Sequence, residues 1–322
     1  GDHRDLHLSI RRQRQMCIRD SPWIGLPRRL ILFLMRLISR ILYLLQVPLF
    51  AVGTQFLTLP SNAEELAAGS HPTAGRFFSV NPAVFTAPEK HPELSVCHGT
   101  WLGGVTTTNL AYNQNIKNRT LHIQFRYSGL TDIELRDHRP SDEPMAHFSS
   151  FGISGNVGVS FGSARSRYGL SLETIRMGIY NESAQGLALN AGYLHRFPNK
   201  LSLGFSILNI GKMSALGSTA PLLPTRVFVG LAKELNFGAY SNTLHLSSEW
   251  NKVSETVQVW VGNIFNWKKL RIMAGTSATS EIYTASAGMG LQLGQYNISY
   301  GIRFGSQDIG LPQTITLHFR LP

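Results

Sequence analysis

Apolar and polar side chains alternate with a period of two through most of the chain beyond residue 94. Residues 120–130 show the pattern well, since Phe125 falls among the apolar positions and Gln124 among the polar ones. Successive side chains of a β-strand point to opposite faces, so this segment predicts a strand with one apolar face and one polar face. Beyond residue 90 we find no apolar stripe with the spacing of a helix.

The alternating pattern recurs in about 14 segments, most of them about 9 to 13 residues long. They are roughly 94–102, 105–115, 120–130, 146–161, 167–177, 186–196, 200–210, 225–235, 242–251, 256–265, 269–278, 282–293, 295–304 and 312–321. Strands of soluble sandwiches are usually shorter, whereas a tilted strand needs about 9 to 11 residues to cross a bilayer. An even number of long strands is typical of bacterial transmembrane barrels.

The lengths of the connections between these segments alternate as well. Short connections fall at 116–119, 162–166, 197–199, 236–241, 266–268 and around Gly294. The two longest, 130–145 and 211–224, fall between short ones. Outer-membrane barrels have short turns at the periplasmic end and longer loops outside, and the connections follow this rule.

The sequence therefore predicts an all-β protein, a transmembrane antiparallel β-barrel of about 14 strands over residues 94–322. Hydrocarbon offers no hydrogen-bond partner to an open sheet edge, so the first and last strands must meet. A soluble β-sandwich or solenoid is the alternative, because alternation alone does not distinguish lipid from a packed core. Interior glycines suit bends or small lumen-facing positions: Gly155, Gly158, Gly204, Gly288 and Gly290.

The N-terminal region up to residue 52 has a different character. Residues 9–21 resemble translated sequencing-adapter read-through, so we treat residues 1–34 as a sequencing or upstream artefact. Residues 35–52 carry two arginines and then an apolar run of about 11 residues, the arrangement of a signal peptide that directs export. Ala51 and Gly53 are possible cleavage positions. A membrane anchor that begins near Arg28 is the alternative.

Residues 53–93 lie between the predicted signal peptide and the barrel. We expect a short helix at 63–68, with Ser61 or Asn62 as its N-cap and Gly69 after its end, and a turn at Asn81–Pro82. A segment of this length fills the lumen as a plug or packs on the periplasmic rim, and both remain open. The candidate plug residues are Ser61, Asn62, Glu64, Glu65, Asn81 and Pro82.

The net charge of +11 comes largely from the N-terminus. Residues 1–46 contain nine of the 30 Lys and Arg residues but only three of the 19 Asp and Glu residues. The later basic residues are scattered, without the clustered stripe and interleaved aromatics that follow a phosphate backbone, so we expect no nucleic-acid partner. Cys17 and Cys97 form neither a CxxC pair nor part of a metal-ligand set.

Motifs for catalysis or cofactor binding are weak. Residues 158–162 match the nucleophile-elbow pattern, but a strand follows them in place of the required helix. Gly288–Gly290 lacks the helix and the downstream acid of a dinucleotide site. The acidic residues between 132 and 143 lack the ordered spacing of a calcium loop. We therefore expect a non-enzymatic protein without a cofactor or a metal.

A set of motifs between residues 55 and 322 carries a family resemblance. The motifs are Leu59–Gly69, Asn81–Ala83, Trp101–Leu102, Ile175–Gly186, Leu208–Gly211, Ile298–Tyr300 and Ile315–Leu321. Together they resemble the PorV/PorQ family, whose members usually have a glycine-rich stretch followed by acidic residues where this chain has Gly69–Gly75. The resemblance implies an outer-membrane barrel similar to the fatty-acid transporter FadL, and several members are type IX secretion components.

Two functions remain open for an outer-membrane barrel of this kind. By analogy with PorV and PorQ it would serve secretion or surface attachment, with membrane lipids around it and secreted proteins or secretion-system components as partners. Candidate outer-loop contacts are Asp132, Glu134, Asp137, Leu222 and Leu223. The alternative is a FadL-like transporter of hydrophobic small molecules, with a movable plug and a lateral opening. An apolar pocket beside the plug would favour transport, whereas a sealed polar lumen with apolar loop tips would favour docking.

Overall fold

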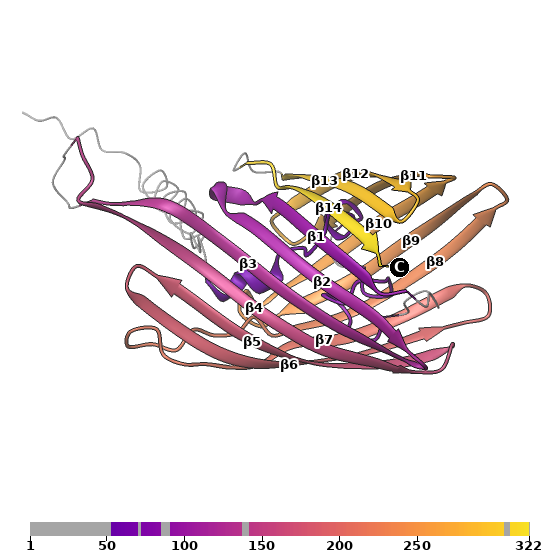
Figure 1. Cartoon of the computed structure of the whole chain (residues 1–322), viewed down its shortest axis with the longest axis horizontal. Coiled ribbons are helices and arrows are strands. Elements are labelled where there is room, and N and C mark those ends of the chain that lie inside the picture. The colour runs from indigo at the N-terminus through magenta and orange to yellow at the C-terminus, as the bar shows by residue number, and fades with distance from the viewer. Residues whose placement is uncertain (1–52, 70–71, 85–90, 137–141, 306–309, 322) are drawn as a thin grey trace, which may run out of the picture. The chain divides into compact units, whose positions relative to one another are not determined.

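The computed structural model describes residues 53–69, 72–84, 91–136, 142–305 and 310–321. Fourteen antiparallel strands follow one another around a closed barrel, in which β1 (Glu93–Thr100) pairs with β14 (Gln313–Arg320) (Figure 1). The predicted fold class, a transmembrane-type antiparallel barrel, is confirmed. Within the described ranges no helix has the length and apolar character that a membrane-spanning helix needs.

The remaining strands correspond one to one with the predicted segments. They are β2 (Thr106–Ile116), β3 (Arg119–Leu135), β4 (Ala146–Gly162), β5 (Ser166–Ile179), β6 (Glu182–Arg196), β7 (Leu201–Met213), β8 (Arg226–Phe237), β9 (Tyr240–Asn251), β10 (Thr256–Trp267), β11 (Leu270–Ala278), β12 (Tyr283–Leu293) and β13 (Tyr296–Gly305). Each pairs with its neighbour in sequence, so the barrel is an up-and-down meander.

The predicted faces are those observed. Phe125 on β3 is 44% exposed on the outside of the barrel, whereas its neighbour Gln124 is 8% exposed and faces the lumen. Phe125 pairs across the sheet with Leu110 on one side and Gly155 on the other. Because cross-strand partners share a face, the register carries the apolar outer surface from strand to strand.

Aromatic side chains gather on the outer surface near the short turns. The ring centroids of Tyr168 and Tyr193 lie 5.2 Å apart, and those of Phe237 and Tyr240 lie 5.4 Å apart. Such aromatic girdles mark the membrane–water interface of transmembrane barrels. We call the end of the barrel with these short connections the turn end, and the opposite end the loop end.

The loop end differs from the prediction at the β3–β4 hairpin. Asp132 and Glu134 were expected in a loop, but they lie within β3, and Figure 1 shows this hairpin extending beyond its neighbours. Pairing with β4 resumes at Ile133 after a bulge that follows Leu130. The bulge accommodates Asp132 with a φ of +62°, so the ladder continues where the polar sequence indicated a loop. Asp137 lies outside the described residues.

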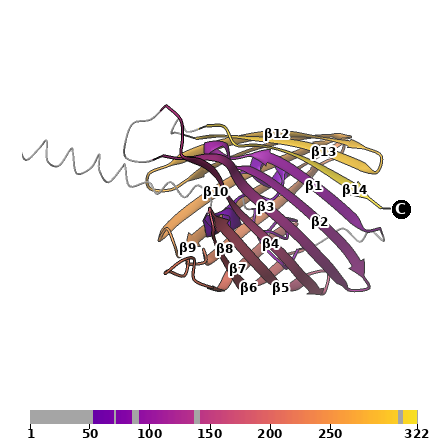
Figure 2. The same ribbon diagram turned by 60° about the vertical axis from the view of Figure 1, so that its left-hand side comes forward.

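Residues 53–69 and 72–84 run inside the barrel, and we call them the plug. The plug contains the 3₁₀-helix η1 (Thr54–Thr58) and the helix α3 (Ala63–Ala67), which Figure 2 shows within the ring of strands. The Asn62 side chain accepts a hydrogen bond from the Glu65 backbone N–H at 2.7 Å, so Asn62 and not Ser61 is the N-cap. The predicted artefact and signal peptide, residues 1–34 and 35–52, lie outside the described residues.

Inward-facing glycines of the wall allow the plug to approach closely. A Cβ atom on Gly262 would overlap the Ala68 carbonyl oxygen, and one on Gly169 would overlap the backbone of Pro82. The glycines that meet the plug in this way are Gly152, Gly158, Gly169, Gly192, Gly204, Gly230, Gly262, Gly275, Gly288 and Gly301, and we call them the glycine belt. Gly204 and Gly288 are thus at small lumen-facing positions, as predicted, whereas Gly155 lies on the outer face.

The register generates a first prediction. Phe125→Arg should lower the free energy of unfolding by about 2–4 kcal/mol, because an outward arginine near mid-strand meets hydrocarbon. Gln124→Arg, its control, places the charge in the polar lumen and should cost much less. Urea titration in lipid vesicles measures both values, and equal losses would show that the assigned faces are wrong.

The glycine belt generates a second prediction. Gly262→Ala should destabilise the protein by about 1–3 kcal/mol, because the added methyl group displaces the plug backbone at Ala68. Gly155→Ala adds the same group to an outward strand position, where the Thr174 hydroxyl is the nearest atom, and should be nearly neutral. Protease cleavage of the plug should accelerate in Gly262→Ala and not in Gly155→Ala. An unchanged cleavage rate in both variants would contradict the close packing of the plug against Gly262.

Candidate functional site: the plugged lumen

The loop-end half of the lumen contains an apolar cluster beside the plug, which we call the apolar chamber. Its buried members are Phe56, Leu57, Ile175, Met177, Ala184, Ala188, Met213 and Leu223, and Leu216 packs against them. They come from η1, from β5 to β7 and from the β7–β8 connection. Phe56 and Leu57 of the plug fill the chamber with side chains that are 3% and 6% exposed. An apolar molecule could therefore occupy this space only if η1 withdrew.

The wall next to the apolar chamber lacks regular strand pairing. β7 and β8 pair only as far as Leu208 and Arg226, although β7 continues to Met213. Beyond Leu208, β7 pairs with β6 alone, after an irregularity near Asn190. Asn209 has a φ of +61°, a left-handed conformation that non-glycine residues seldom adopt. We call this interruption the β7–β8 seam.

A segment of the β7–β8 connection occupies the seam. The Asn209 amide donates to the Pro224 carbonyl at 3.0 Å, and the Thr225 hydroxyl donates to the Asn209 carbonyl at 3.1 Å. Leu222 is 71% exposed, while the adjacent Leu223 is 6% exposed and belongs to the chamber. The connection therefore passes between the outside of the barrel and its apolar interior.

The plug is linked to this connection at one end and to polar wall residues in the middle. The Thr54 hydroxyl donates to the Leu222 carbonyl at 2.6 Å. Further along, serine and threonine hydroxyls satisfy the plug backbone: Thr316 accepts from Ala63 N–H at 2.8 Å, and Ser206 donates to the Val80 carbonyl at 2.6 Å. Polar partners for the plug backbone remove the cost of burying it.

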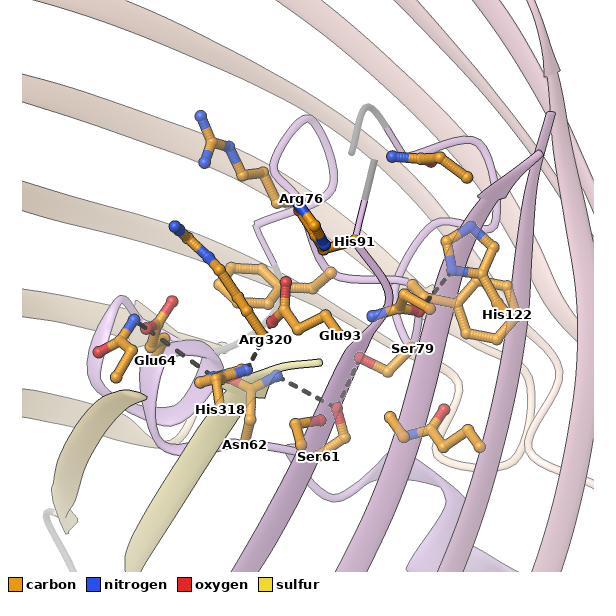
Figure 3. Close-up of a pocket in the computed structure, with 18 of the residues that line it drawn as sticks. Ser61, Asn62, Glu64, Arg76, Ser79, His91, Glu93, His122, His318 and Arg320 are labelled. Carbon is orange, nitrogen blue, oxygen red and sulfur yellow. Dashed lines mark hydrogen bonds and ion pairs between the residues drawn. The ribbon is translucent and has the colours of Figure 1, made fainter. Parts of the chain in front are cut away.

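The carboxylate of Glu64 holds the turn-end side of the plug against the wall. It forms an ion pair with Arg271 of β11 and accepts a hydrogen bond from the Ser299 hydroxyl at 3.1 Å. Nε2 of His318 lies 4.0 Å from the same carboxylate, and Nδ1 of His318 bonds to Glu93 at 2.9 Å (Figure 3). This network joins α3 to three neighbouring parts of the barrel.

The carboxylate of Glu65 acts within the plug. It accepts hydrogen bonds from the Ser61 backbone N–H at 3.0 Å and from the Ser61 and Ser79 hydroxyls at 2.8 Å each. Asn81 lies near the C-terminal end of the plug, where its side-chain amide donates a hydrogen bond to the Thr73 carbonyl at 3.0 Å. Pro82 lies against Gly169 of the belt.

The predicted outer-loop residues do not form one surface. Asp132 pairs with His147 at 2.7 Å, and Glu134 pairs with Arg136 at 2.6 Å, each within the β3–β4 hairpin. Leu222 is exposed as expected. Leu223 was expected at a loop tip and instead packs inside the chamber, because a neighbouring position on an extended backbone points the opposite way.

Sequence reasoning did not identify several charged residues that face the lumen. Arg126 donates to the Phe56 carbonyl of the plug at 3.1 Å. Arg226 and Glu249 form a buried ion pair, with Nε to Oε1 at 2.6 Å, and the Arg226 guanidinium lies 4.6 Å from the Phe228 ring centroid. Arg271 and Glu173 also face the lumen. A charged residue at a polar position of an alternating strand is the sequence signal from which their position in the lumen could have been predicted.

The described residues form neither a cluster of metal ligands nor the strand–helix turn of a nucleophile elbow at Ser160. No group of three or more His, Cys, Asp or Glu side chains in these ranges could hold a metal ion. Ser160, the centre of the elbow-like motif, lies within β4, where it receives a hydrogen bond from Arg167 at 2.8 Å, and a turn leads from it into β5. A strand follows the motif, as the sequence indicated.

The turn-end half of the lumen has two cavities. One, of about 200 Å³, lies between the plug and β14 and is lined by Glu64, Glu93 and His318. The other, of about 700 Å³, opens among the turns and is lined partly by Arg76 and Glu234. Both are lined by charged and polar side chains together with apolar surface, whereas the members of the loop-end chamber are all apolar.

These features define a plugged, fourteen-strand transmembrane β-barrel, and solved structures with the same fold are similar to this chain. The Pseudomonas putida toluene transporter TodX has a TM-score of 0.60 at 13% identity, covering 80% of this chain and 96% of that chain. The CymD monoaromatic hydrocarbon channel has a TM-score of 0.61 at 9% identity, covering 82% and 98%. A Pseudomonas aeruginosa FadL homologue has a TM-score of 0.57 at 12% identity, covering 81% and 98%. No protein-family model and no curated protein matches the sequence.

The Glu64 network generates a third prediction. Glu64→Gln should lower the free energy of unfolding by about 1–3 kcal/mol, since Arg271 loses its counter-charge in a partly buried site. Glu134→Gln removes an ion pair whose two side chains are 47% and 42% exposed, so it should change the value little. Urea titration measures both, and a loss of the same size in the Glu134 variant would argue against a specific role for the network.

Proposed function

We propose that this protein is an outer-membrane transporter of hydrophobic small molecules. The observation that carries the proposal is the apolar chamber, which lies inside the lumen and against the β7–β8 seam. Ligand sites are typically concave and mostly apolar, with a few polar groups at defined positions. An apolar cluster beside the plug supports transport over docking.

The seam and the plug suggest a route. A hydrophobic molecule enters from the loop end, replaces Phe56 and Leu57 in the chamber, and leaves sideways where β7 lacks its β8 partner. The hydrogen bond from Thr54 to the Leu222 carbonyl couples the two movements, because displacement of η1 also releases the connection that occupies the seam. Strand pairs that stay hydrogen-bonded along their length make a lateral exit between them more costly.

Similar structures support this substrate class. Two of them are described as a toluene transporter and a monoaromatic hydrocarbon channel. A secretion role by analogy with PorV and PorQ has less support, since Asp132 and Glu134 pair within their own hairpin and Leu223 lies in the chamber. Secreted proteins as partners therefore stay a prediction from the sequence.

An outer-membrane location follows from the same proposal. The outward apolar side chains and the aromatic girdle suit a barrel surrounded by lipid. Residues 35–52 would direct export and be removed, leaving η1 near the new N-terminus inside the lumen. The turn end would then face the periplasm, as short turns do in barrels of this type.

Adjacent leucines provide the test. Leu223→Arg places a charge in the chamber and should reduce the uptake of isotope-labelled toluene by about tenfold or more in cells that express the protein. Leu222→Arg changes an exposed neighbour and should leave uptake near the unmodified level. Both variants should reach the outer membrane in equal amounts. Equal uptake by cells with and without the unmodified protein would overturn the proposal.

A further inference from the structure

The larger turn-end cavity carries more positive than negative charge. Arg76 of the plug, Arg165 of the β4–β5 turn, Arg196 at the end of β6 and Lys200 of the β6–β7 turn all line it. Glu234 of β8 also lines the cavity, and the other two charged lining residues form the plug–wall ion pair described above. Four cationic side chains therefore face one carboxylate, an excess of three positive charges.

The cations that line the cavity lie close to one another. The guanidinium of Arg76 repels that of Arg196, and Glu234 attracts the latter. The Arg196 backbone N–H donates to the Arg165 carbonyl at 2.7 Å, which fixes two of the cationic segments side by side. In the part of the chain that the structure describes, no ion pair involves Arg76, Arg165 or Lys200. Like charges in one concave site raise the local concentration of anions.

Arg76 is placed to join the plug to the wall through a ligand. Figure 3 shows its guanidinium pointing away from the paired side chains of Glu93 and His318. The other cations of the cavity belong to strands and turns of the barrel. A bound anion would therefore contact both the plug and the wall.

The cavity is also lined by a histidine and by apolar side chains. His245 of β9 is only 7% exposed, and its buried Nδ1 atom has no hydrogen-bond partner among the described residues. Phe77, Phe197 and Ile264 add apolar surface to the same cavity.

We propose that this cavity binds a small organic anion with two acidic groups on an apolar frame, of the aromatic dicarboxylate class. A ligand with one carboxylate would neutralise one of the three excess positive charges. A ligand with two carboxylates can bind an arginine of the plug with one and an arginine of the wall with the other. Arginine suits this role because its planar guanidinium binds a carboxylate through two hydrogen bonds. The bound anion holds the plug in its closed position. The site is separate from the apolar chamber and does not depend on hydrocarbon transport.

Isothermal titration of the purified full chain in a neutral detergent at low ionic strength tests the proposal, with phthalate as the probe. Phthalate should bind about tenfold more tightly than benzoate, which has the same ring and one carboxylate. Arg76→Gln and Arg196→Gln should each weaken phthalate binding by about tenfold. Arg136→Gln, which changes an exposed arginine at the loop end, is the matched control and should leave the affinity unchanged.

A stability measurement separates bridging from simple binding. Phthalate should slow protease cleavage of the plug in the unmodified protein and in Arg136→Gln, and have no effect on cleavage in Arg76→Gln. Equal affinities for phthalate and benzoate, or equal affinities of the Arg76 and Arg136 variants, would overturn the proposal. Tighter binding of an acidic hexapeptide than of phthalate would also overturn it, in favour of a protein partner at the turn end.

Discussion

The fold depends on one constraint: in hydrocarbon, every backbone N–H and C=O must find its hydrogen-bond partner within the protein. The ladder that runs from β1 around to β14 satisfies it and leaves the outer face to apolar side chains. The β7–β8 seam is an interruption of that ladder, and side-chain and carbonyl groups of Asn209, Pro224 and Thr225 replace the missing strand pairing there. Such substitute bonds can be exchanged without unfolding the barrel, which is why the seam is the part of the wall suited to opening.

Filling the lumen imposes a second requirement, which the wall meets with small residues. Glycines of the belt let the plug backbone lie against the strands, and hydroxyls such as those of Thr316 and Ser206 satisfy its polar groups. The plug is held through the polar network of Glu64 at the turn end. At the loop end it is held by the apolar packing of Phe56 together with hydrogen bonds from Arg126 and Thr54, so displacement of η1 would require both to be exchanged.

Much of this architecture could be predicted from residue patterns. Alternation located all fourteen strands, because facing lipid and facing the lumen impose opposite preferences on neighbouring positions. The short turns and the helix α3 of the plug also followed from local sequence. The extension of β3 through Asp132 did not, since a bulge that depends on pairing with β4 carries the strand through a polar stretch. The ion pair of Arg226 with Glu249 was missed because its members come from different strands.

The sequence by itself determined the strands, their faces and the candidate plug residues, because these depend on side-chain preference at single positions and on spacing between near neighbours. Only the tertiary structure decided where the plug lies, that Leu222 and Leu223 point to opposite sides of the wall, and that cations from the plug and from three separate wall segments share one cavity. Those facts depend on strand register and on long-range contacts. Some of these contacts join residues more than a hundred positions apart, such as Thr54 and Leu222. Short-range patterns carry no information about such pairs, and closure of the barrel brings them together.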